Sequence, residues 1–332
     1  CAAGGVAVNI YLTHGSTTRD VTNILSAWTW SGDKAAISRQ LSADFAYIEG
    51  SSLPVPEVGD LLTMADGEKK LFIGVILLRT LGSEDSTLSC TAYDYGYYLQ
   101  RNDGTYKFTG APAEAITRTA CADRGIPVAS LPSTGIPLRR KFAAVRLSQL
   151  ITTAWTLASE KNGKSYAIRY TPDGLLVKER SANSASLVLK ASSNLMDATT
   201  KEDASKMVNS VAIYDSSGNF IRRYGDASAQ KLYGVMESHI TQRENGAADA
   251  DATAKKALED GRFQRTVTVN VLGDHSLITG ETVVVREAKT GLSGVFWIDA
   301  DVHTWKRGNY YAKLTLNCRN VMATASAGSE DL

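Results

Sequence analysis

Short runs of alternating apolar and polar residues, separated by Gly, Pro, Asn and Asp, extend along most of this chain and predict β-strands joined by turns. The most informative run is residues 57–78, EVGDLLTMADGEKKLFIGVILL. It predicts two strands joined by the tight turn Ala65-Asp66-Gly67, because Gly adopts positive φ at no steric cost. A β-hairpin is therefore expected near the start of the chain.

A similar run returns near the other end, at residues 279–298, TGETVVVREAKTGLSGVFWI. Gly280 and Gly294 in this run match Gly59 and Gly74 in the first. Further strands are predicted before and after the two runs, at 36–45 and 86–93 in the first copy and at 265–272 and 310–317 in the second. A unit that appears twice predicts one small β module used twice, so the two copies are expected to superpose.

The middle of the chain has a helical period instead. Residues 112–123 have Pro and Glu at the start and apolar residues on one face, and residues 147–163 repeat apolar residues at helical spacing. Residues 166–178 then alternate around the turn Pro172-Asp173-Gly174, which predicts a hairpin. Two helices followed by a hairpin predict a small α+β domain.

Three further stretches complete the assignment. Residues 192–206 are polar and are expected to connect the middle domain to the last module. Residues 247–260 are Ala-rich and predict one surface helix, which Gly261 ends. Residues 325–332 are small and polar and predict a frayed tail.

The predicted fold class is therefore mainly β with an α+β insert, in which two similar small β-barrels flank a small α+β domain. The predicted domains are 1–105 for the first β-barrel module, 106–200 for the α+β middle domain, 201–322 for the second β-barrel module with its surface helix, and 323–332 for a flexible tail.

Composition narrows the function classes. The 332 residues are 43% hydrophobic and 21% charged with a net charge of +1, which is ordinary for a soluble globular protein. Balanced charge argues against a grip on double-stranded DNA through many phosphates. No apolar run approaches the ~20 residues of a membrane span. The aromatic run Tyr93–Tyr98 lacks interleaved basic residues, so buried or interfacial tyrosines are expected instead of nucleic-acid contacts.

The four cysteines do not form a recognisable site. Cys1, Cys90, Cys121 and Cys318 have no C-x-x-C spacing, and scattered thiols in so large a chain are expected to be buried apolar groups. A mature lipoprotein also begins with Cys, so Cys1 leaves lipid anchoring open, but a trimmed end is favoured.

Candidate catalytic and metal-binding motifs are weak. Asn162-Gly163-Lys164-Ser165 contains G-K-S without the earlier Gly or the strand-then-helix order of a phosphate loop. Asp299, Asp301 and His303 alternate along the chain, so an extended strand would place them on one face. They could bind a divalent metal ion, or the face that they share could simply be solvated. No pair of carboxylates or nucleophile motif is singled out. No catalytic, cofactor-binding or metal-binding residue is assigned.

Two tryptophans form a second aromatic candidate. Trp28 and Trp30 share a face of an extended strand. An aromatic binding site is one interpretation, and packing beneath a sheet is the favoured one.

Four groups of residues in this order resemble the baseplate hub proteins of contractile phage tails and phage-tail-like bacteriocins, of the XkdQ/YqbQ and late control protein D type. These groups are Val58-Gly59-Asp60 with Leu71–Val75 and Cys90–Asp94; Lys206–Val211 with Lys231–Gly234; Val267–Val269 with Leu277–Glu281 and Gly294–Ile298; and Asp301-Val302-His303 with Tyr310–Leu316.

The resemblance implies a structural role without a cofactor. Such hubs are homotrimers in which each chain supplies two similar β-barrels, so that six barrels adapt a six-fold tail tube to a three-fold spike. The implied partners are the tail tube protein and the central spike protein, with the tape-measure protein and the baseplate wedge as wider neighbours. Neither specific nucleic acid nor stable membrane insertion is implied. The implied location is the tail or baseplate, after assembly in the bacterial cytoplasm.

The resemblance also gives His303 no catalytic role, so a buried or hydrogen-bonded structural His is expected. Two other function classes stay open at this point. One is a peptidoglycan hydrolase associated with the tail, with acidic residues of the middle domain acting as acid and base. The other is a lipoprotein-like binding module anchored through Cys1.

Overall fold

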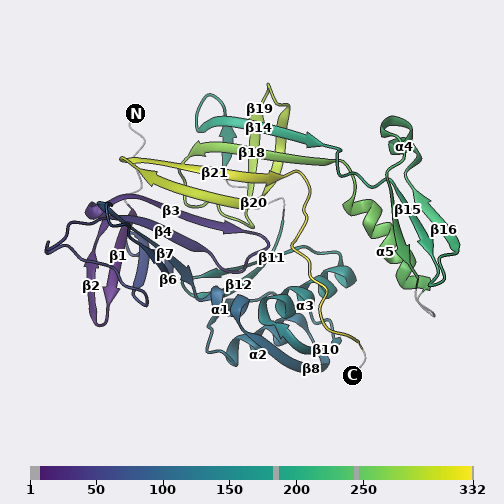
Figure 1. The fold of residues 1–332 in the computed structure, drawn as a ribbon, viewed down its shortest axis with the longest axis horizontal. Coiled ribbons are helices and arrows are strands. Elements are labelled where there is room, and N and C mark those ends of the chain that lie inside the picture. The colour runs from purple at the N-terminus through teal and green to yellow at the C-terminus, as the bar shows by residue number, and fades with distance from the viewer. Residues whose placement is uncertain (1–7, 182–186, 243–246, 331–332) are drawn as a thin grey trace. The chain divides into compact units, whose positions relative to one another are not determined.

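The computed structural model describes residues 8–181, 187–242 and 247–330. The chain forms two compact units, a main unit of Cys1–Thr199 with Thr268–Leu332 and an inserted unit of Thr200–Val267. Strands dominate the described residues (Figure 1), as the sequence predicts. The three-way division of the chain stays a prediction.

One large sheet contains most strands of the main unit. Its members are β1 (Val8–His14), β2 (Thr17–Asp20), β3 (Leu25–Asp33), β4 (Gln40–Ala46), β5 (Leu61–Asp66), β6 (Lys69–Thr80), β7 (Thr87–Asp94), β13 (Val188–Lys190), β14 (Leu195–Asp203), β18 (Gln264–Leu272), β19 (Thr282–Glu287), β20 (Leu292–Lys306) and β21 (Asn309–Asn317). The strand order is β14-β18-β21-β20-β3-β4-β7-β6-β5-β1-β2, with β19 paired to β20 and β13 paired to β19. A short 3-10 helix, η1 (Thr22–Ile24), precedes β3.

Both predicted hairpins are present. In the first, β5 and β6 pair antiparallel from Leu61↔Val75 to Asp66↔Lys69, and Gly67 in the turn has φ 58°. In the second, β19 and β20 pair antiparallel from Thr282↔Trp297 to Glu287↔Leu292.

The same order of strands occurs twice within the large sheet. The first copy runs β3-β4-β7-β6-β5 across the sheet, and the second runs β14-β18-β21-β20-β19. The fourth strand in each of these orders has a register shift at the same place, after Ile76 in β6 and after Ile298 in β20. The inserted unit therefore lies between β14 and β18, where the first copy has only the short connection between β3 and β4.

The two copies also share a glycine at the entry to the hairpin. Gly59 (φ 102°) donates its N–H to the Ile76 carbonyl at 2.9 Å, and Gly280 (φ 92°) donates to the Ile298 carbonyl at 3.0 Å. Positive φ at both positions explains the choice of Gly. The predicted equivalence of Gly59 and Gly280 is confirmed.

The predicted equivalence of Gly74 and Gly294 is wrong. Aligning Ile76 with Ile298 places Phe296 at the position of Gly74. The two glycines also serve different purposes: a Cβ on Gly74 would lie 2.6 Å from the Tyr93 carbonyl oxygen, whereas Gly294 has open space and φ 134°. Gly74 is needed because the neighbouring strand approaches closely, whereas Gly294 is needed because its backbone has positive φ. The similarity of the two sequences therefore aligned glycines with different roles.

The two copies join into one sheet. Strand β3 of the first copy pairs antiparallel with β20 of the second, from Ala300↔Asp33 to Lys306↔Ala27. We call this strand pair the seam. Among the described strands, the pairing continues through the seam and closes no barrel.

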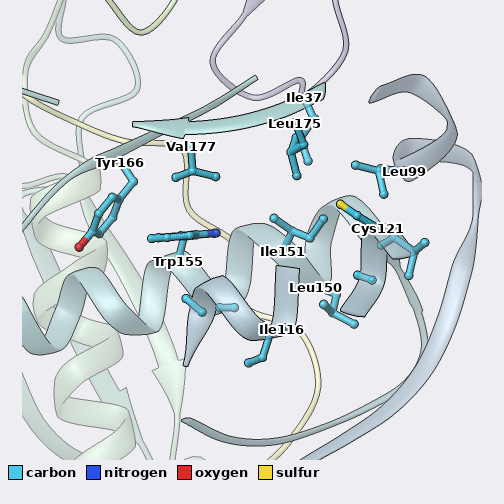
Figure 2. Packing of buried hydrophobic residues seen from close by; sticks show 14 of the residues in the cluster. Ile37, Leu99, Ile116, Cys121, Leu150, Ile151, Trp155, Tyr166, Leu175 and Val177 are labelled. Carbon is cyan, nitrogen blue, oxygen red and sulfur yellow. The ribbon is translucent and has the colours of Figure 1, made fainter. Parts of the chain in front are cut away.

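The middle of the main unit forms the predicted α+β region. Its elements are α1 (Gly96–Arg101), β8 (Asp103–Ala111), α2 (Ala113–Ala122), β9 (Val128–Ser130), β10 (Leu138–Arg146), α3 (Leu147–Asn162), β11 (Tyr166–Thr171) and β12 (Gly174–Glu179). Both predicted helices and the predicted hairpin are present. Figure 2 shows α3 at the centre of this core, with Trp155 facing Val177 and Tyr166. The buried Trp155 indole donates to Thr117 Oγ1 at 3.0 Å, which satisfies its polar N–H.

The predicted frayed tail is wrong for residues 325–330. Ala325 and Ala327 donate their N–H groups to Thr156 and Thr153 of α3, and Ser329 pairs with Lys141 of β10. Met322, just before this segment, is buried in the α+β core. Small polar residues predicted disorder, but here their backbone is satisfied by neighbouring elements.

The polar connection at 192–206 also contains regular structure, since β14 forms there and pairs with β18. Its half-exposed position at the end of the sheet explains the low apolar content. The inserted unit contains β15 (Ser210–Tyr214), β16 (Phe220–Gly225), α4 (Ala227–Tyr233), β17 (Glu237–Thr241) and α5 (Ala247–Asp260). Helix α5 is the predicted Ala-rich helix, and Ala250 and Ala254 pack on Val211 and Ile213.

Candidate functional site

Aromatic and buried polar side chains lie together at the seam. Trp28 of β3 and Trp305 of β20 are cross-strand partners, and their rings stack with centroids 5.7 Å apart. Tyr310 of β21 stacks on the other side of Trp305 at 4.1 Å. Stacked aromatic pairs stabilise beyond the area they bury. The predicted packing of Trp28 and Trp30 beneath a sheet is confirmed, with Trp30 buried.

A buried ion pair crosses the seam. The Arg39 guanidinium donates to both carboxylate oxygens of Asp301, with Nη1 at 3.0 Å from Oδ1, and the two side chains are 5% and 0% exposed. Arg39 also lies over the Trp30 ring at 3.9 Å. Bidentate geometry and a cation–π contact together compensate the burial of the guanidinium.

Asp301 is held ionised by its surroundings. Thr279 donates to Oδ1 through its N–H at 2.7 Å and its hydroxyl at 2.6 Å. Burial would raise the pKa of the Asp301 carboxyl, but Arg39 and the hydrogen bonds outweigh it and keep the pKa well below its usual range. The carboxylate therefore ties β20, Arg39 and Thr279 together.

His303 is buried and hydrogen-bonded, as the resemblance implies. Its Nε2 lies 3.1 Å from the Leu277 carbonyl and its Nδ1 lies 2.9 Å from the Tyr310 hydroxyl. A carbonyl only accepts, so Nε2 carries the proton and the Tyr310 hydroxyl donates to Nδ1. Burial raises the pKa of Tyr310, which keeps that hydroxyl protonated.

The three alternating residues 299, 301 and 303 do not form a common site. Asp299 is contacted by Lys34 at 2.5 Å, Arg180 at 3.4 Å and Asn317 at 3.1 Å, whereas Asp301 faces Arg39. The register shift after Ile298 separates the two carboxylates. No cluster of metal-ligating side chains was found in the residues that the structure describes.

The G-K-S motif has the geometry of a helix end. Gly163 ends α3 with φ 71° and donates to Ser159, and β11 follows. Lys164 pairs with Glu179 across the hairpin at 2.8 Å. Helix precedes strand here, which is the reverse of the order in a phosphate loop.

A cleft of about 430 Å³ lies between the α+β region and the large sheet. Glu281 and Asp173 are among its lining residues. Glu281 accepts from Arg169 at 2.8 Å and Lys178 at 2.7 Å. Burial raises the pKa of Glu281, but the two cations outweigh it and lower the pKa overall. An ionised, doubly paired carboxylate is a poor general acid.

Three residues that complete the buried network at the seam, Arg39, Thr279 and Tyr310, were not among the candidates predicted from the sequence. The available signal was weak: Asp301 and His303 alternate with apolar residues on a strand, which is typical of a buried face. A buried charge requires a partner, but the sequence could not name it, since Arg39 lies 262 residues away.

Two of the three described cysteines follow the expectation of buried thiols. Cys90 and Cys121 are free and buried, whereas Cys318 is free and exposed. Cys1 lies outside the described residues. A search of the described helices finds none with the length and apolar character of a membrane span.

Comparison with known families decides the relationship. The YQBQ-like family matches residues 28–317. The chain belongs to the YQBQ-like family. It is 23% identical to the uncharacterized protein YqbQ of Bacillus subtilis strain 168 over 255 residues, which cover 75% of this chain and 78% of that protein. It is 22% identical over 271 residues to the phage-like element PBSX protein XkdQ of the same strain, covering 80% and 83%.

Solved tail proteins share the fold of this YQBQ-like chain. The 43 kDa tail protein of prophage MuSo2 from Shewanella oneidensis superposes with a TM-score of 0.70 at 14% identity, covering 95% of this chain and 99% of that one. The E. coli c3393 protein, a component of the type VI secretion system with structural similarity to the T4 tail proteins gp27 and gp5, has a TM-score of 0.54 at 11% identity, covering 91% and 76%. The resemblance given by the sequence is confirmed.

Proposed function

We propose that this chain is a structural baseplate hub of a contractile phage tail or tail-like particle. Three copies form a ring that adapts the six-fold tail tube to a three-fold spike. Each β module supplies one barrel-like sixth of that ring.

The observation that carries the proposal is the duplicated strand order inside one chain. A chain with one module can form a ring of three-fold or of six-fold symmetry, but one such ring cannot match a six-fold tube on one face and a three-fold spike on the other. A chain with two near-copies presents six similar faces to a tube while three copies keep a true three-fold axis for a spike. The seam supports this role, because it fixes the two copies against each other through the buried Arg39–Asp301 pair.

The partners follow from the ring. The tail tube protein is expected on the face of the ring where the six similar modules lie, and the central spike protein on the face with three-fold symmetry. The tape-measure protein and the baseplate wedge are expected as wider neighbours. The E. coli c3393 protein, which shares this fold, is structurally similar to two T4 tail proteins, and this supports neighbours within a tail. The protein would reside in the tail or baseplate after assembly in the bacterial cytoplasm.

The proposed role is not enzymatic. The buried carboxylates at the seam and in the cleft each have cationic partners, as for Asp301, Asp299 and Glu281. Such pairing stabilises a scaffold and disfavours the protonated carboxyl that glycoside hydrolysis needs. No observation favours the hydrolase, so it remains only an outcome to test.

The test is particle association and mass. Tail particles purified from a producing strain should contain this protein in a ratio of three copies per spike trimer, and the purified protein should be trimeric alone or with tube or spike protein. A monomer that is absent from particles would refute the proposal. Release of soluble peptidoglycan fragments that is abolished by Glu281→Gln or Asp173→Asn would establish the hydrolase.

A further inference from the structure

The cleft of about 430 Å³ between the α+β region and the large sheet is formed within one chain. Its volume is in the range of pockets that bind small molecules, which are mostly apolar and contain a few well-placed polar groups. The proposed hub role gives the cleft no function. The side chains that line it therefore indicate what else this chain can bind.

Apolar and aromatic side chains form much of the cleft wall. Trp30 of β3, Leu71 of β6 and Leu277 of the loop before β19 line it from the large sheet, and Tyr170 of β11 and Leu176 of β12 line it from the α+β region. Trp30, Tyr170 and Leu277 are buried. An apolar group that enters the cleft would leave water against these side chains, which is favourable.

Basic side chains reach the same cleft from three places in the fold. Lys69 is the first residue of β6, Arg169 belongs to β11, and Arg39 directly precedes β4. The charge of Arg39 is balanced by Asp301. Lys69 is exposed and forms no ion pair with a described residue, so its charge is available to a ligand.

A second positive charge is uncompensated because two cations share one carboxylate. Arg169 and Lys178 both donate to Glu281, at 2.8 Å and 2.7 Å, so this group of three has one positive charge in excess. The other acidic lining residue, Asp173, is exposed in the turn between β11 and β12, where water and salt screen it. The charges of the lining therefore favour an anion.

Hydrogen-bond donors at the cleft also exceed the acceptors. Nε of Arg39, Nε of Arg169 and Nδ1 of His275 are buried and have no hydrogen-bond partner among the described residues. Arg169 donates through its other nitrogens to the Thr279 carbonyl, at 3.0 Å, and to Glu281. Guanidinium groups only donate, and buried polar groups are nearly always paired. This excess of donors favours a ligand that brings acceptor oxygens.

We propose that the cleft binds a small organic anion, with an aliphatic or aromatic body and one carboxylate. The body packs against Trp30, Leu71 and Tyr170, and the carboxylate is held by Arg169 together with Lys69. Hydrogen bonds from a cation to a carboxylate are among the strong ones. The site lies within one chain, so it goes beyond the proposed hub function and does not depend on ring formation.

Isothermal titration calorimetry of the full-length protein at neutral pH and low salt tests the ligand class. 1-Naphthoate has an aromatic body and a carboxylate, 1-naphthalenemethanol has the same body without the charge, and acetate has the carboxylate without the body. 1-Naphthoate is expected to bind one site per chain, about tenfold or more tightly than either of the others. Equal affinity for 1-naphthoate and 1-naphthalenemethanol, or no saturable binding of 1-naphthoate, would overturn the proposal.

Substitutions of lining residues test the place of the carboxylate. Arg169→Gln should weaken 1-naphthoate binding about tenfold or more, because it removes a charged hydrogen bond. Lys69→Gln should also weaken it, and Asp173→Asn should strengthen it, because each changes the charge at the cleft. The matched control is Lys70→Gln, which removes the neighbouring exposed lysine outside the lining and should leave the affinity unchanged. Since Lys69 and Asp173 are exposed, their variants keep the test valid even if Arg169→Gln fails to fold. Unchanged affinity in both Lys69→Gln and Asp173→Asn would overturn the assignment.

Amide hydrogen exchange locates the ligand independently. Saturating 1-naphthoate should slow exchange in β11, β12 and residues 275–282, because a ligand that binds the folded state suppresses its local opening. The inserted unit should be unaffected. Slower exchange only outside these segments would overturn the proposed site. A protein that binds 1-naphthoate but is monomeric and absent from particles would refute the hub function and leave this inference standing.

Discussion

The Asp301→Asn substitution tests whether the seam depends on its buried ion pair. Asn has nearly the same shape as Asp, so the change removes the charge without making a cavity. Arg39 is 5% exposed and would then be a buried cation without its counter-charge. Removing one partner of a buried pair costs about 3–5 kcal/mol. Since ~1.4 kcal/mol is a factor of ten, the ratio of folded to unfolded main unit should fall more than a hundredfold.

Urea unfolding followed by tryptophan fluorescence measures this loss. All five tryptophans lie in the main unit, so the signal reports the unit that contains the seam. The matched control is Asp103→Asn, which removes the surface pair of Asp103 with Arg146, whose side chains are 53% and 46% exposed. That change should cost less than about 1 kcal/mol.

A second variant separates the charge from the packing. Arg39→Met with Asp301→Leu replaces the pair by apolar residues and should recover most of the loss, because neither leaves a buried charge unpaired. If Asp301→Asn changes the free energy of unfolding no more than the surface control does, the argument that this pair holds the seam is refuted.

Three further predictions concern other parts of the main unit. Burial raises the pKa of Asp94 to about 7, although Arg39 and Gly96 donate backbone N–H groups to its carboxyl. The folded state therefore holds the proton more tightly than the unfolded state, and the free energy of unfolding should fall as the pH rises from about 4 to about 7. Asp94→Asn should remove this dependence in urea titrations that are repeated at each pH. Gly280→Ala should lower the urea midpoint more than Gly59→Ala, since both have positive φ but only the Gly280 Cβ would meet Ala167 at 2.7 Å; equal losses would contradict this. Met322→Ala should cost about 2–5 kcal/mol and make the C-terminal segment sensitive to limited proteolysis, whereas a frayed tail would lose nothing.

Local patterns in the sequence predicted the local elements well. The hairpins around Gly67 and at 279–298, the helices α2 and α3, and the hairpin β11–β12 all follow from periodicity and turn residues. The duplication was also visible, because the same local signals appear twice. Each of these features depends on residues within a few positions of one another.

Predictions failed where a distant part of the chain decided the outcome. Residues 325–330 are ordered because α3 and β10 accept their backbone hydrogen bonds. Strand β14 forms because it pairs with β18, a strand that follows the inserted unit in the sequence. Gly294 was aligned with Gly74 because sequence similarity does not reveal loop length and register shifts.

The sequence by itself determined that this chain is mainly β, that one β module occurs twice, and that an α+β region lies between the copies. The tertiary structure decided that β3 and β20 join the copies and that Asp301 is paired with Arg39. The physical reason is that alternation encodes the conformation and burial of a strand, whereas its partner depends on contacts such as Arg39–Asp301, 262 residues apart, which no local pattern contains.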